Sequence, residues 1–168
     1  NNTINYKGFS FSMLWSYRHG GDVYSNTVSA LVGRGLVKDT EDRESTFILP
    51  GVRQDGSPNT IQVNNSDYYF GNVAFGPDEL QIYDGSTLRL REISVGYSLP
   101  RKFLDKTPFG NVSITFSGQN LWFKGFGVPD STNFDPESLG VGVGNGLGLE
   151  FLNGPSSKRY GVSVKATF

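Results

Sequence analysis

The amino-acid sequence predicts an all-β fold built from antiparallel strands. Three observations support this class. Four segments alternate apolar and polar side chains with the period of two that a strand requires. Glycine (22), tyrosine (8) and phenylalanine (13) are abundant among the 168 residues, which suits strands and loops. The connectors between the four segments alternate between short and long.

The first and last strands are expected at 9–19 and 158–168, where the alternation is clearest. In both segments one face is apolar and the other is mostly polar or small. On the last strand, Ser163 and Lys165 lie on the polar face. The apolar faces consist of Phe9, Phe11, Met13, Trp15 and Tyr17 on the first strand, and Tyr160, Val162, Val164 and Phe168 on the last.

Two further strands are expected at 82–99 and 111–123. In the first of them the apolar positions change parity, from Leu88 and Leu90 to Ile93 and Val95. Side chains alternate strictly along a strand, so this slip predicts either a bulge near Arg91 or a change of the buried face.

The connectors at 6–8 and 100–110 are short, whereas those at 20–81 and 124–157 are long and rich in Gly, Pro, Asn, Asp and Ser. Short turns on one side and long loops on the other are typical of outer-membrane β-barrels. Tyr160 and Phe168 are eight residues apart, or about 26 Å along a strand, which matches the apolar band of about 25 Å with its aromatic girdles. From periodicity alone, a soluble secreted β-sandwich that binds carbohydrate through its aromatic loops is equally compatible.

Composition excludes several classes of function. The 15 basic and 16 acidic residues are interleaved and give a net charge of −1, so no basic stripe for nucleic acid exists. The chain lacks cysteine, which removes disulfides, thiolate metal sites and cysteine nucleophiles. Mean hydropathy is −0.32, but low hydropathy is also expected of barrel strands that alternate between lipid and lumen. The chain begins at Asn1 without a leader pattern, so any signal peptide is expected upstream.

Several motifs together resemble the C-terminal region of the SusC/RagA family of TonB-linked outer-membrane transporters. The most specific is the run from Tyr83 to Pro100, which contains R-L-R, G-Y and L-P in the family's order. A terminal Phe168 that closes an alternating strand resembles the signal recognised by the barrel-assembly machinery. The other matching segments are Asn2 to Phe9, Gly20 to Tyr24, Leu49 to Val52, Asp67 to Tyr69, Ser117 to Leu121, Asp135 to Glu137 and Arg159 to Gly161.

The resemblance implies a large transmembrane β-barrel of the plugged, 22-strand type. Residues 1–168 would supply its last strands and two extracellular loops, at about 20–81 and 124–157, and would lack the plug domain. It also implies import of an oligosaccharide or peptide across the bacterial outer membrane. The expected partners are outer-membrane lipid, a SusD-like lipoprotein, and the TonB complex through the absent N-terminal part.

Enzymatic chemistry has little support in the sequence. The one histidine, His19, lacks the context of a catalytic triad. No cofactor is expected. Asp130, Asn133, Asp135 and Glu137 offer oxygen ligands for calcium, but the glycine spacing of an EF-hand loop is missing. The glycines of 140–148 recur every second residue and do not form a nucleotide-binding motif.

The residues that remain for function are aromatic and acidic side chains of the long loops. They can contact a substrate or a partner lid, or simply pack the loops together. The predicted contact residues are Tyr68, Tyr69, Phe70, Phe126, Asp130, Phe134, Asp135 and Glu137, and the predicted lipid-facing residues are the nine apolar side chains of the first and last strands.

Overall fold

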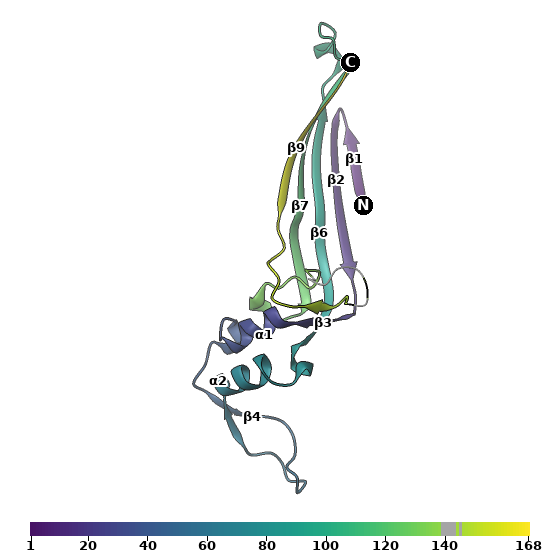
Figure 1. Ribbon diagram of the computed structural model, residues 1–168. Coiled ribbons are helices and arrows are strands. Elements are labelled where there is room, and N and C mark those ends of the chain that lie inside the picture. Colours follow the sequence, from purple (N-terminus) through teal and green to yellow (C-terminus); the bar gives the residue numbers. More distant parts are fainter. Residues whose placement is uncertain (139–143, 145) are drawn as a thin grey trace. The chain divides into compact units, whose positions relative to one another are not determined.

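A computed structural model describes residues 1–138, 144 and 146–168 (Figure 1). The chain forms two compact units. The strand unit comprises Asn1–Arg18, Thr87–Lys124 and Ser156–Phe168, and the loop unit comprises His19–Ser86 and Gly125–Pro155.

Long strands make up most of the strand unit. They are β1 (Asn2–Tyr6), β2 (Phe9–Arg18), β6 (Ile82–Ser98), β7 (Asn111–Gly127) and β9 (Arg159–Thr167). They pair in the order β1-β2-β6-β7-β9, and the pairs β1–β2, β2–β6 and β7–β9 are antiparallel. β7 continues four residues beyond the expected 111–123, so Phe126 lies on a strand and not in a loop.

Two turns at the same end of these strands are short. Lys7 and Gly8 join β1 to β2 with positive φ angles of 46° and 88°, the geometry of a type I′ hairpin turn. The turn from β6 to β7 contains the 3-10 helix η4 (Arg101–Phe103), after which Leu104 is buried.

Cross-strand pairing gives the sheet two chemically different faces, because directly opposed residues of an antiparallel pair point to the same side. Phe9 is opposite Tyr97, and on the same face Phe11 is opposite Val95. The other face pairs Ser12 with Ser94, whose hydroxyls are 2.8 Å apart.

The pair β7–β9 repeats this division. Ile114 is opposite Val164, and Phe116 is opposite Val162, so the apolar side chains of the two strands again share one face. Ser113 is opposite Lys165, and Thr115 is opposite Ser163, on the other face. The two faces defined by β2 and β6 are therefore also found on β7 and β9.

A β-bulge in β6 explains the parity slip in the sequence. Leu14 is opposite Glu92 but Trp15 is opposite Leu90, so Arg91 is an extra residue of β6 relative to β2. Arg91 Nε donates a hydrogen bond to Ser16 Oγ at 2.8 Å. The first of the two predicted explanations is thus confirmed, and the apolar residues on both sides of the bulge keep one face.

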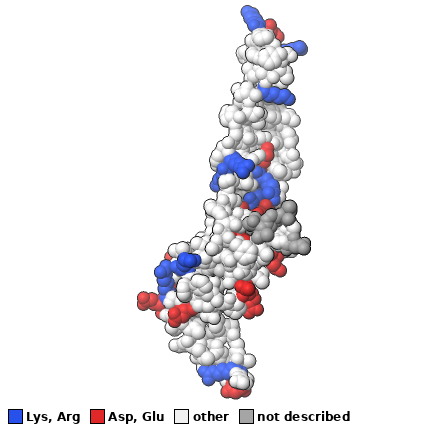
Figure 2. Space-filling model, viewed as in Figure 1, with Lys and Arg blue, Asp and Glu red and all other residues white. Residues whose placement is uncertain are grey.

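The apolar side chains of β9 are largely exposed among the residues that the structure describes. Tyr160, Val162 and Val164 are 77%, 67% and 66% exposed. On the face visible in Figure 2, charged side chains gather in separate clusters, and stretches of uncharged surface lie between them. Exposed apolar rows of this kind mark surfaces that meet another apolar phase or a partner.

The loop unit is folded, which differs from the loops expected at 20–81 and 124–157. Its core consists of Val23, Val28, Val32, Val37, Val73 and Phe134. Apolar residues that are distant in sequence bury one another here, so a segment rich in turn-forming residues still acquires helices and strands. The elements are β3 (Asp22–Ser25), α1 (Asn26–Gly33), η1 (Lys38–Thr40), β4 (Thr46–Ile48), β5 (Gln62–Asn64), α2 (Asn65–Tyr68), η2 (Tyr69–Ala74), η3 (Asp78–Gln81), η5 (Asp130–Thr132) and β8 (Leu149–Glu150).

Within this unit β3 pairs antiparallel with the start of β6 and parallel with β8, and β4 pairs with β5. None of the helices in the described ranges combines the length and apolar character needed to cross a bilayer.

A candidate ligand pocket in the loop unit

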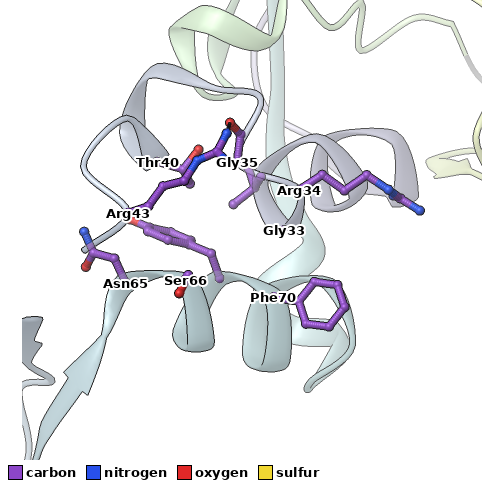
Figure 3. Close-up of a pocket in the computed structure, with 10 residues that line it drawn as sticks. Gly33, Arg34, Gly35, Thr40, Arg43, Asn65, Ser66 and Phe70 are labelled. Carbon is purple, nitrogen blue, oxygen red and sulfur yellow. Dashed lines mark hydrogen bonds between the residues drawn. The ribbon is translucent and has the colours of Figure 1, made fainter. Parts of the chain in front are cut away.

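A pocket of about 330 Å³ lies between the C-terminal end of α1 and the helical segment formed by α2 and η2 (Figure 3). We call it the α1–α2 pocket. Gly33, Arg34 and Gly35 contribute from the end of α1, and Tyr69 and Phe70 from the start of η2. Thr40, Arg43, Asn65 and Ser66 supply further polar groups.

Helix α1 begins and ends at residues suited to those positions. Ser25 is the N-cap, and its hydroxyl accepts a hydrogen bond from Val28 N at 3.2 Å. After the last turn, Gly35 N donates to Val32 O at 2.9 Å, and Gly35 has a φ of +68°. Glycine reaches this left-handed conformation without strain, which ends the helix at the edge of the pocket.

The opposite wall begins at Asn64, whose side chain caps α2 by accepting from Ser66 N at 2.8 Å. The helix then continues as a π-helical turn from Tyr69 to Ala74. Such wide turns are rare and occur frequently at functional sites. The wider turn follows directly from the capped α2 and contributes Tyr69 and Phe70 to the pocket.

The polar side chains at the pocket are held in place by hydrogen bonds to the main chain. Arg43 Nη2 donates to Gly35 O at 2.7 Å, and Asn65 Nδ2 donates to Asp42 O at 2.6 Å. Burial, together with the nearby charge of Asp39, raises the pKa of the Tyr69 phenol above its ordinary value. The pocket therefore combines fixed donors with aromatic surface.

The first predicted group of contact residues is partly brought together here. Tyr69 and Phe70 line the pocket, as described. Tyr68 does not. Its ring packs edge-on against Phe47 and Tyr69, with centroids 5.2 Å and 5.3 Å apart. Tyr68 thus holds the pocket wall and is not itself a lining residue.

The second predicted group does not line this pocket. Phe134 and Asp135 are only 7% and 4% exposed, so little of either side chain is open to a contact in this structure. Phe134 fills the core of the loop unit, and Asp135 accepts a hydrogen bond from Glu137 N at 3.0 Å. Phe126 is 52% exposed on β7.

Three other predictions concern the segment 124–157. Asp130 begins η5, and its side chain lies outside the part of the chain that the structure describes. The glycine tract 140–148 falls largely on 139–143 and 145, which are also outside the described residues. Within the described ranges, no group of three or more His, Cys, Asp or Glu residues is placed to hold a metal ion.

Sequence reasoning missed Gly33, Arg34 and Arg43. Arg43 lies in a run of alternating charges that is typical of a solvated surface. One signal was available: Asn64 followed by Ser66 and Asp67 is a helix N-terminus pattern inside the presumed loop.

The closest approach of the two pocket walls provides a test. A methyl group added at Gly33 would clash with Ala74 Cβ and crowd Tyr69 O. We expect Gly33→Ala to destabilise the loop unit by about 1–3 kcal/mol, since the walls must move apart. Hydrogen exchange of the amides of 65–75 would report the change. Gly71→Ala is the matched control, because nothing lies within 4 Å of its added carbon. Equal exchange in both variants would contradict tight packing at Gly33.

Comparisons with known proteins find similarity in both sequence and fold. No protein-family model matches the chain. The relatives found are a TonB-dependent receptor and a peptide importer, and they match the chain over nearly its whole length. The resemblance to SusC/RagA-like TonB-dependent transporters is therefore confirmed.

The individual relatives are as follows. TonB-dependent receptor P3 of Formosa agariphila is 25% identical over 173 aligned residues, which cover 100% of this chain and 16% of the receptor. The RagAB peptide importer in its closed-closed state matches with a TM-score of 0.57 and 18% identity, over 95% of this chain and 15% of that chain. Its open-open state matches with a TM-score of 0.53 and 20% identity, over 97% of this chain and 16% of that chain. The chain thus spans about a sixth of the length of these proteins.

Proposed function

We propose that the chain forms the C-terminal sector of a TonB-dependent transporter in a bacterial outer membrane. The observation that carries this proposal is the two-faced sheet, whose apolar row on β9 is exposed along the whole strand. In a soluble β-sandwich one face of such a strand would be covered by a second sheet. The apolar side chains of β9 are 66–77% exposed, which instead suits a strand whose apolar face contacts lipid.

The proposal places one face of the sheet against lipid and the other against the barrel lumen. The face that carries Phe9, Trp15, Val162 and Val164 contacts hydrocarbon, and the face that carries Lys165 lines the lumen. A lysine at the bilayer midplane costs about 2–4 kcal/mol, so the opposite assignment is unfavourable. The remaining lipid-facing residues are Phe11, Met13, Tyr17, Tyr160 and Phe168.

The sheet also has to be completed by other strands. Among the described strands, β1 pairs only with β2 and β9 only with β7, so the sheet has two open edges. Open edges are unfavourable in lipid, because their backbone groups cannot be satisfied. A large barrel of the 22-strand type, closed by strands outside residues 1–168, removes both edges.

In this proposal the loop unit is extracellular and takes part in capture of the nutrient. The imported nutrient is an oligosaccharide or a peptide, held between the loops and a SusD-like lipoprotein. Energy comes from the TonB complex through parts of the transporter outside this chain. The relatives support import over catalysis, because they are described as a receptor and as peptide importers.

Cell fractionation tests the proposal. The full-length protein is expected in the outer-membrane fraction, resistant to high salt and released by detergent. Residues 1–168 expressed alone should aggregate without detergent, because the open edges and the apolar face remain exposed. A monodisperse, detergent-free monomer of residues 1–168 would instead favour the soluble sandwich.

A further inference from the structure

Arg34 lies between two cavities of the loop unit. Besides the α1–α2 pocket, a cavity of about 230 Å³ is lined by residues that include Ala30, Ala74 and Phe75. Arg34 lines both cavities. A single ligand that occupies both cavities would therefore contact Arg34.

The charged lining of the two cavities is entirely basic. Arg34 and Arg43 are its charged residues, and neither aspartate nor glutamate is among the described residues that line either cavity. Arg43 donates to Gly35 O, and Arg34 Nη1 makes a long contact of 3.5 Å with Ala30 O. A guanidinium has five N–H donors and no acceptor, so both arginines retain N–H groups that can be donated to an acceptor-rich ligand in place of water.

An aromatic pair provides the apolar part of the same surface. Phe70 lines the first cavity and Phe75 the second. Their ring centroids are 5.0 Å apart at an angle of 69°, and the residues are 55% and 69% exposed. Exposed phenylalanines in edge-to-face contact leave ring faces open for an apolar or ring-shaped group.

The two arginines differ in their place at the cavities. Arg34 lines both cavities, whereas Arg43 lines only the first and already donates to Gly35 O at 2.7 Å. Arg34 extends away from Arg43, Gly35 and Thr40 (Figure 3). Arg34 is therefore the better anchor for a negative charge.

We propose that the two cavities form one site for a carboxylate carried on an apolar or ring-shaped body, with Arg34 binding the carboxylate and Phe70 and Phe75 the body. A carboxylate matches the planar fork of arginine and makes stronger hydrogen bonds than a neutral acceptor. The inference rests on the proposed function, because it names the class of nutrient that the extracellular loops select. An acidic peptide and an acidic oligosaccharide both carry this chemistry.

Calorimetry on the purified full-length transporter tests the site. The probes are a tetrapeptide with one glutamate beside phenylalanine, its glutamine counterpart, a tetramer of galacturonic acid and its neutral galactose counterpart. We expect at least one acidic probe to bind about tenfold more tightly than its neutral counterpart, and Arg34→Gln to remove that difference. The acidic probe that binds identifies the source of the carboxylate.

The control is Arg53→Gln, since Arg53 is an exposed loop arginine that lines neither cavity and hydrogen-bonds Thr60. It should leave all affinities unchanged, whereas Phe70→Ala should weaken both the acidic and the neutral probe. The inference is overturned if no acidic probe is preferred, or if Arg34→Gln and Arg53→Gln behave alike. Outer-membrane assembly is measured on the same samples, so a protein that assembles normally but lacks the preference refutes this site and not the transporter assignment.

Discussion

Glu150→Gln is expected to weaken the attachment of residues 149–153 to helix α1 by about 2–3 kcal/mol. The Glu150 side chain is fully buried and accepts four hydrogen bonds. Ser25 Oγ and Thr27 N donate to Oε2 at 2.7 Å and 3.0 Å, and Thr27 Oγ1 and Asn153 N donate to Oε1, each at 2.6 Å. Each carboxylate oxygen of Glu150 therefore accepts one hydrogen bond from a main-chain N–H. In the Glu150→Gln variant the side-chain NH₂ group must face one of these two N–H donors, and a main-chain donor cannot rotate away.

The same contacts give the attachment a pH dependence. Burial alone would raise the pKa of Glu150, but the hydrogen bonds from Thr27, Ser25 and Asn153 outweigh it and lower the pKa below the ordinary value of 4.5. Because the folded-state pKa is the lower one, the stabilisation is complete above the unfolded-state pKa. It is lost as the pH falls through the folded-state pKa.

Hydrogen exchange of the Thr27 and Val28 amides, corrected for intrinsic rates, would measure this effect between pH 3 and pH 7. Wild-type protection should fall toward the acid end, and the Glu150→Gln variant should be less protected and nearly independent of pH. Glu79→Gln is a suitable control, since Glu79 is exposed in η3. If Glu150→Gln left these amides as protected as Glu79→Gln does, the buried carboxylate would not hold α1.

A lysine introduced on β9 should have very different effects at two adjacent positions. Val164 is opposite Ile114 on the apolar face, and Ser163 is opposite Thr115 on the polar face. Residue 164 is midway between Tyr160 and Phe168, so the proposal places it near the bilayer midplane. Val164→Lys is expected to cost about 2–4 kcal/mol of barrel stability, and Ser163→Lys much less.

Reversible unfolding of the full-length transporter in lipid bilayers would give both values. The two variants add the same charge to the same strand one residue apart, so differences in expression or strand propensity largely cancel. Equal destabilisation by both lysines, or a larger effect at Ser163, would reject the assignment of lipid to the apolar face.

The strands could be predicted from the sequence because the alternation of apolar and polar residues is a local pattern. The expected ranges 9–19 and 158–168 compare with the observed Phe9–Arg18 and Arg159–Thr167. The first differs by one residue at its C-terminal end, and the last by one residue at each end. Alternation is set by adjacent residues, so it survives without knowledge of the fold. The bulge at Arg91 was visible in the same pattern, since an extra residue changes the parity of all that follow.

The fold of the loop unit could not be predicted from a local pattern, because its core joins residues from distant segments. Helix α1 has only eight residues, and Val28 and Val32 are buried against Val73 and Phe134. A helix this short is marginal without tertiary packing. The pocket depends on that packing, so Tyr69 and Phe70 were identified by residue type, whereas Arg34 and Arg43 could not be.

The bulge at Arg91 also gives β6 one residue more than the paired stretch of β2. Deleting Arg91 would leave Leu90 opposite Trp15 and Glu92 opposite Leu14, so the pairing of β2 with β6 would continue without a bulge and the side chains of this pair would keep their faces. The same deletion at Ser94, without compensation by the bulge, would turn the neighbouring side chains to the wrong face. Insertions and deletions among related chains should therefore accumulate at this point of the strand, where a change in length does not exchange the two sides of the sheet.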